Sequence, residues 1–147
     1  MNKTWELKTE YELLSLGSRL GALLKKGAFV ALYGDLGAGK TVLARGIGSA
    51  FGVERMNSPT FTIVQQYHTE PPLYHFDAYR LENSLELYAM GYADYDDGII
   101  LMEWANLVND ALPKDRLDVF IEGSGDAPRL LTMVPRGKVY EEIVERL

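Results

Sequence analysis

The sequence contains no cysteine, and this absence removes three kinds of chemistry at once. Disulfide bonds, thiolate metal sites and cysteine nucleophiles are all excluded. Histidine is scarce as well: only His68 and His75 are present, and their spacing matches no metal-ligand pattern. We therefore expect both histidines to be packing or surface residues.

Long apolar segments and an excess of positive charge are also missing. No run approaches the roughly 18 apolar residues of a membrane span, and residues 1–6 lack the apolar centre of a signal peptide. Acidic residues outnumber basic ones by 21 to 15, giving a net charge of −6. Because broad binding to nucleic acid needs a basic surface, we do not expect it here. These features favour a cytoplasmic protein without a membrane anchor.

The remaining composition is that of an ordinary globular chain. Its 147 residues are 47% apolar and 24% charged, and they contain no internal repeat and no linker that divides them. One domain typically takes about 150 residues. We therefore expect residues 1–147 to form a single domain.

Apolar patterning predicts strands that alternate with helices, followed by an antiparallel hairpin near the end. The runs at 28–33 and 99–102 are continuously apolar, which is typical of strands buried on both faces. Residues 91–98 are expected to be a loop. Helices are predicted over residues 10–25, 41–51, 84–90 and 140–147, and strands over residues 5–7, 28–33, 61–67, 73–77, 99–103, 117–121 and 130–134. This order predicts an α/β fold with a mixed central sheet.

Residues 34–41 (GDLGAGKT) match the phosphate-loop pattern G-x-x-x-x-G-K-[ST] at every fixed position. Glycines let the backbone curl so that successive N–H groups converge on phosphate oxygens, and the following helix directs its positive end at the same anion. The segment also lies between a predicted strand and a predicted helix, as the pattern requires. We therefore expect a P-loop NTPase-like, three-layer fold with helices on both faces of the sheet.

The same chemistry assigns roles within this phosphate loop. Lys40 should reach the β- and γ-phosphates, and the hydroxyl of Thr41 should complete a Mg²⁺ shell. The residues predicted to contact the nucleotide in this segment are Asp35, Leu36, Gly37, Ala38, Gly39, Lys40, Thr41 and Val42.

Two carboxylates stand where predicted strands end. Asp77 ends the strand 73–77, and Glu103 ends the strand 99–103. The carboxyl ends of parallel strands converge on the ligand crevice, and hydrolysis needs a carboxylate near the metal and a group that positions water. Asp77 and Glu103 are therefore candidate catalytic and metal-binding residues, although either one alone could be a solvated strand end.

Four segments together resemble the bacterial TsaE (YjeE) family of ATPases that act in tRNA threonylcarbamoyladenosine biosynthesis. Their order and spacing fit the family across nearly the whole chain, while the final thirty residues match only loosely, mainly through Arg129. The four segments are residues 34–41 (GDLGAGKT), 58–62 (SPTFT), 75–81 (HFDAYRL) and 103–104 (EW).

The resemblance implies that Lys40 and Thr41 hold the triphosphate and Mg²⁺, and that Asp77 and Glu103 belong to the metal and water site. It implies that residues 58–62, including Thr60, behave as a switch near the γ-phosphate. Leu13 is a departure, because family members often carry a threonine at this position.

Arg80 lies three residues after Asp77 and is a candidate contact for the γ-phosphate as it develops charge. Its alternative is a surface salt bridge with Glu82 or Glu86, a kind of pair that contributes little stability.

The resemblance implies a Mg²⁺-dependent ATPase with two partner proteins, TsaB and TsaD. We expect its intrinsic turnover to be slow, because the sequence places no obvious arginine finger or dedicated base. In that family TsaD transfers the carbamoyl group, so this chain would support the assembly rather than perform the transfer. Direct contact with tRNA is not expected from the acidic charge balance.

Two other functions share the phosphate loop. A small-molecule kinase is the first alternative, but such kinases usually carry a lid with several arginines, and no arginine cluster is present. A GTP-dependent switch is the second, but residues 2–5 (NKTW) lack the aspartate of the N/T-K-x-D segment that selects guanine and precede the loop.

Overall fold

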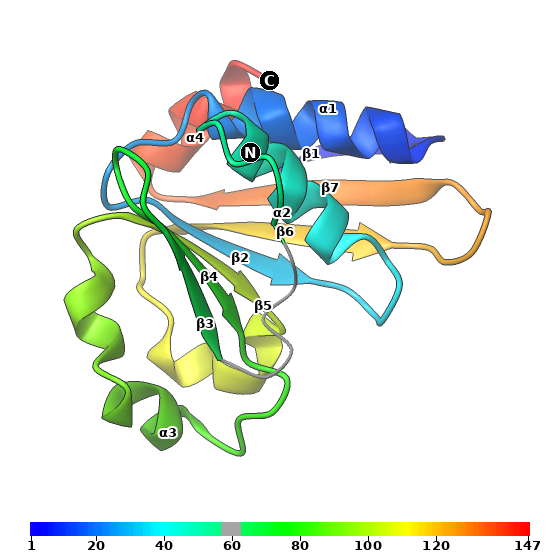
Figure 1. Ribbon diagram of the computed structural model, residues 1–147. Helices are drawn as coiled ribbons and strands as arrows, with labels where there is room; N and C mark the ends of the chain where they lie inside the picture. The colour runs from blue at the N-terminus through cyan, green and yellow to red at the C-terminus, as the bar shows by residue number, and fades with distance from the viewer. Residues whose placement is uncertain (57–62) are drawn as a thin grey trace.

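The computed structural model describes residues 1–56 and 63–147, and these form a seven-stranded mixed sheet flanked by helices (Figure 1). The strand order is β1-β7-β6-β2-β5-β4-β3. The strands are β1 (Lys3–Leu7), β2 (Phe29–Tyr33), β3 (Val64–Tyr67), β4 (Leu73–Asp77), β5 (Ile99–Glu103), β6 (Arg116–Glu122) and β7 (Arg129–Arg136). The helices are α1 (Glu10–Gly21), α2 (Lys40–Ser49), α3 (Ser84–Ala89) and α4 (Lys138–Glu145), with 3₁₀ helices η1 (Tyr92–Tyr95) and η2 (Ala105–Ala111).

The centre of the sheet is parallel and its flanks are antiparallel. Strand β2 pairs in parallel with β5 and β6, and β4 pairs in parallel with β5. The flanking strands β3, β7 and β1 join antiparallel, and β1 and β3 lie at the edges of the sheet. The hairpin expected near the end of the chain is confirmed as β6–β7. In this register Asp77 and Glu103 are directly paired, which brings the ends of β4 and β5 to the same edge of the sheet.

Side chains alternate between two cores, one on each face of the sheet. On β2, Val30 and Leu32 belong to the core formed with α1, α2 and α4, while Phe29 and Ala31 belong to the core with α3, η1 and η2. Figure 1 shows α1, α2 and α4 on one side of the sheet and α3 on the other. The expected α/β fold with three layers is therefore confirmed.

Several predicted boundaries differ from the structure. The helix predicted over 10–25 ends at Gly21, and the helix predicted over 140–147 already begins at Lys138. The strand predicted over 61–67 includes two residues outside the described ranges; of the other five, Val64–Tyr67 form β3. Within residues 1–56 and 63–147, no helix has the length and hydropathy needed to cross a bilayer.

Two short helices were not anticipated. Residues 91–98, expected to be a loop, include η1, and residues 105–111 form η2. The rings of Tyr92 and Tyr95 pack edge-on against Phe76, with centroids 5.9 and 5.5 Å away. Burial of these aromatic rings therefore orders a segment whose acidic composition is typical of a loop.

Helices α1 and α2 approach each other closely at glycines. A Cβ atom at Gly17 would lie 2.6 Å from the carbonyl oxygen of Leu43, and one at Gly46 would lie 2.4 Å from that of Leu14. Both distances are too short for carbon against backbone oxygen. The position of α2, and with it the start of that helix, therefore depends on these glycines.

We predict that Gly46→Ala lowers the free energy of unfolding by about 1–3 kcal/mol, because the added methyl group forces α1 and α2 apart. Urea unfolding measures this change. Gly48→Ala on the same helix is the matched control, since its nearest neighbour is the flexible end of Met56. Equal stability of the two variants would contradict the close-packing argument.

Candidate functional site

The phosphate loop, residues 34–41, connects the end of β2 to the start of α2 and curls back on itself (Figure 1). Gly37 and Gly39 have positive φ angles of 82° and 114°, which side chains other than glycine rarely adopt. The N–H of Ala38 donates to the carbonyl of Asp35 at 3.0 Å and closes the turn. Leu13 limits the space further, because a Cβ atom at Gly39 would lie 2.6 Å from its Cδ2 atom.

The ammonium group of Lys40 lies within this loop. Its Nζ donates to the carbonyl oxygens of Gly34 and Asp35, the latter at 3.0 Å, and sits 4.1 Å from the centre of the Trp104 ring. Burial lowers the pKa of Lys40, while the negative charges of nearby carboxylates, Glu103 foremost, offset part of that shift. This buried ammonium group donates to two neutral carbonyls, so an anion would be a favourable partner for its charge.

The carboxylate of Glu103 joins the end of β5 to the first turn of α2. The hydroxyl of Thr41 donates to it, with distances of 3.1 and 3.2 Å to the two carboxylate oxygens. His75 Nε2 lies 2.5 Å from Glu103 Oε2. Glu103 is only 3% exposed, so these two partners supply hydrogen bonds that water cannot.

Asp77 lies beside Glu103 through the pairing of β4 with β5. One of its oxygens, Oδ1, accepts the backbone N–H of Tyr79 at 2.9 Å, which fixes the carboxylate at the turn after the strand. Within the described ranges no three acidic or histidine side chains form a metal cage. Mg²⁺ needs no such cage, because it commonly takes one or two carboxylates together with phosphate oxygens and waters. Thr41, Asp77 and Glu103 fit that donor set.

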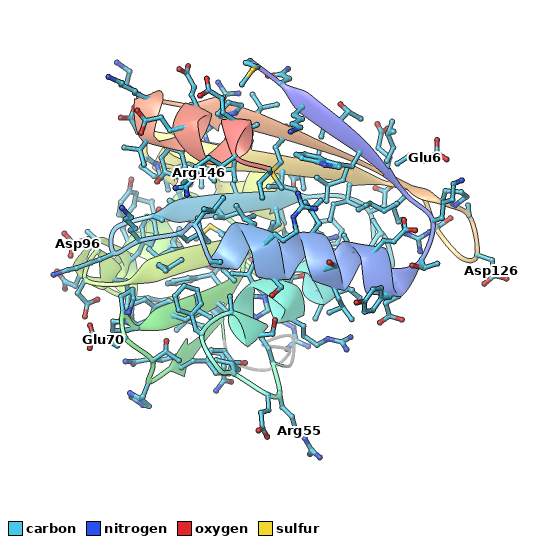
Figure 2. The ribbon with its side chains drawn as sticks, turned by 90° about the horizontal axis from the view of Figure 1, so that it is seen from above. Glu6, Arg55, Glu70, Asp96, Asp126 and Arg146 are labelled. Carbon is cyan, nitrogen blue, oxygen red and sulfur yellow. The ribbon has the colours of Figure 1, made fainter. Side chains whose placement is uncertain are left out.

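Arg129, the first residue of β7, contacts the phosphate loop through loop carbonyls. Its Nε donates to the carbonyl of Ala38 at 2.8 Å, and a terminal nitrogen donates to that of Gly37 at 3.3 Å. The same guanidinium donates to Gly125 in the β6–β7 connection, whose tip is marked by Asp126 in Figure 2. Because C=O and N–H of a trans peptide point in opposite directions, holding the Ala38 carbonyl also fixes the direction of the Gly39 N–H.

The other predicted contacts fall in different surroundings. Leu36 is 85% exposed, whereas the partly buried side chain of Val42 packs against the core of α1, α2 and α4. Thr60 lies outside the described residues. Arg80 is exposed on the turn after β4, and its role toward phosphate stays a prediction.

Sequence reasoning missed three contacts of this site. Trp104 was not expected to cover Lys40, nor Arg129 to hold the loop, because no local pattern connects these residues. His75 is wholly buried and bonded to Glu103, so its interpretation as a packing or surface residue was incomplete. Strand alternation offered a signal, since His75 shares a strand face with Asp77 two residues later.

Comparisons with known proteins agree with this architecture. A family model described as threonylcarbamoyl adenosine biosynthesis protein TsaE matches residues 7–131. The tRNA threonylcarbamoyladenosine biosynthesis protein TsaE of Bacillus subtilis (strain 168) is 37% identical over 145 residues, covering 97% of this chain and 92% of that protein. The protein of the same name from Haemophilus influenzae is 38% identical over 150 residues, covering 96% and 94%. The crystal structure of Bacillus subtilis YdiB gives a TM-score of 0.85 at 33% identity, covering 99% of this chain and 93% of that one. The chain therefore belongs to the TsaE family of threonylcarbamoyl adenosine biosynthesis proteins.

Proposed function

We propose that this protein is a Mg²⁺-dependent ATPase with slow intrinsic turnover that acts in the cytoplasm and supports a TsaB–TsaD assembly in tRNA threonylcarbamoyladenosine biosynthesis. One observation carries the proposal: the phosphate loop presents Lys40 and Thr41 directly beside the buried carboxylate of Glu103. Membership of the TsaE family supports the role in this pathway. The net charge of −6 favours action through protein partners rather than through direct contact with tRNA.

The start of α2 provides the phosphate-binding groups in this proposal. The first intrahelical hydrogen bond after the loop runs from Leu43 N–H to Gly39 at 3.0 Å, so the N–H groups of Lys40, Thr41 and Val42 precede it. N–H groups in this position have no acceptor within their own helix, and the helix dipole favours an anion there. Lys40 would exchange its loop carbonyls for phosphate oxygens.

The carboxylates provide the groups for hydrolysis. Mg²⁺, when bound, neutralises negative charge on the phosphate oxygens. Thr41, Asp77 and Glu103 would hold it, directly or through water, and the carboxylates would orient the attacking water. Arg129 is engaged with loop carbonyls, so it acts as a support for the loop and not as a group directed at the γ-phosphate. Slow turnover follows from this arrangement, and we propose that the partners complete or gate the site.

We predict that Lys40→Ala weakens ATP binding at least about 100-fold, because two charge-assisted contacts of about 1.5–3 kcal/mol each are lost. Isothermal titration calorimetry with ATP and Mg²⁺ measures the affinity, and phosphate release measures turnover. Lys25→Ala, at an exposed lysine before β2, is the matched control and should bind normally. Unchanged binding and hydrolysis in Lys40→Ala would remove the phosphate-loop assignment. Transfer of phosphate to a free small-molecule acceptor would instead favour the kinase alternative.

Charge-removing variants test the carboxylates. We predict that Glu103→Gln and Asp77→Asn each reduce Mg²⁺-dependent turnover at least about 10-fold, a change in barrier of about 1.4 kcal/mol, because the metal site loses negative charge. Nucleotide binding measured without Mg²⁺ should persist, since the loop is intact. Asp126→Asn at the exposed tip of the β6–β7 connection is the control. Full turnover in both site variants would show that the metal site lies elsewhere.

The partner proposal has its own test. Purified protein mixed with TsaB and TsaD in the presence of ATP and Mg²⁺ should co-elute with them in size-exclusion chromatography. The Lys25→Ala variant should behave like the unmodified chain, because its phosphate loop is unchanged. Failure of the unmodified protein to associate with the pair, even with ATP present, would contradict this part of the proposal.

A further inference from the structure

His75 is a fully buried histidine in the middle of β4, with no solvent exposure. Its Nε2 atom lies 2.5 Å from Oε2 of Glu103, the carboxylate at the end of the neighbouring strand. Its other ring nitrogen, Nδ1, is buried and has no hydrogen-bond partner within residues 1–56 and 63–147. The polar contact of this ring is therefore directed at the candidate site.

The two nitrogens together define the direction of the hydrogen bond. A buried N–H without an acceptor is costly, and a buried lone pair is the less costly of the two. The arrangement therefore places the proton on Nε2, which donates to Glu103, and leaves the lone pair on Nδ1. This hydrogen bond is favourable for Glu103, because few other donors among the described residues reach the buried carboxylate.

Glu103 is hydrogen-bonded by side chains from two different elements, α2 and β4. Thr41 donates from the first turn of α2, the element that would exchange contacts when a nucleotide binds. His75 donates from β4, which is paired on both sides, and its neighbour Leu101 on β5 is also fully buried. His75 is thus the partner that belongs to the buried sheet, and Thr41 the partner that belongs to the proposed nucleotide-binding site.

We propose that His75 is a positioning residue for the hydrolysis proposed above: its Nε2–H holds the Glu103 carboxylate toward Thr41, so that the carboxylate meets the metal in one orientation. The inference rests on the proposed function and adds a residue that does not itself touch the nucleotide. Groups that orient metal-binding carboxylates commonly change metal affinity or activity about 10–100-fold when removed. The loss should appear in Mg²⁺ dependence and turnover, and not in Mg²⁺-free nucleotide binding.

Two amide variants, His75→Gln and His75→Asn, test whether a hydrogen-bond donor is needed at the position of Nε2. The amide nitrogen of His75→Gln can stand near the Nε2 position and donate to Glu103, whereas the shorter His75→Asn places its amide near Nδ1. We expect the Gln variant to keep kcat and the Mg²⁺ concentration for half-maximal ATP hydrolysis within about threefold of the unmodified protein, whereas the Asn variant should lose about 10-fold or more in one of them. Both should bind ADP normally in EDTA, measured by calorimetry. His68→Asn, at the exposed histidine, is the control.

The outcomes separate this inference from the proposed function. An unmodified protein without Mg²⁺-dependent ATP hydrolysis contradicts the proposed function, and the inference falls with it. An active unmodified protein whose Gln and Asn variants have equal kcat and Mg²⁺ dependence overturns the positioning role alone. Equal losses of ADP binding in EDTA would also overturn it, because they would reveal a general structural role. If the Asn variant does not fold, a Gln variant with Mg²⁺ dependence shifted 10-fold or more overturns the inference, and a Gln variant with normal dependence supports it.

Discussion

The candidate site depends on the hydrogen bonds of the buried Glu103 carboxylate. It joins three elements that are distant in sequence: Thr41 at the start of α2, His75 within β4, and the end of β5 that carries it. A charge with 3% exposure is stable only while its hydrogen bonds are made, so the carboxylate and its donors must be positioned together. The parallel register of β4 and β5 meets that requirement and also places Asp77 alongside.

The phosphate loop is fixed from outside as well as inside. Glycines at the α1–α2 contact let α2 lie close to α1, and Leu13 of α1 packs against the Gly39 position of the loop. Arg129 ties the loop carbonyls to the β6–β7 connection. Inside the loop, Lys40 is held by two carbonyls and the face of Trp104. Contacts from α1, β7 and the segment after β5 therefore preorganise the loop. This preorganisation lowers the entropic cost of ordering the loop when an anion binds.

Local patterns predicted the parts of this molecule that depend on neighbouring residues. The phosphate-loop motif and the apolar strands β2 and β5 were evident in the sequence. Backbone conformation requires glycine at particular positions of the loop, and burial on both faces requires a continuous apolar run, so both signals lie within a few residues. The packing of Tyr92 and Tyr95 against Phe76, which orders η1, requires strands and loops to meet in three dimensions. The same holds for Arg129, which reaches the loop across 91 positions of sequence. His75 was an intermediate case, because strand alternation could have indicated the face on which it lies but not its partner Glu103.

A crystal structure of the protein with a non-hydrolysable ATP analogue and Mg²⁺ would show whether residues 34–41 bind the triphosphate beside Glu103. We expect the Lys40 ammonium to leave the carbonyls of Gly34 and Asp35 for the β- and γ-phosphates. We also expect the metal to lie at the sheet edge beside Thr41, Asp77 and Glu103. An analogue bound away from residues 34–41, or a metal remote from Glu103, would contradict it.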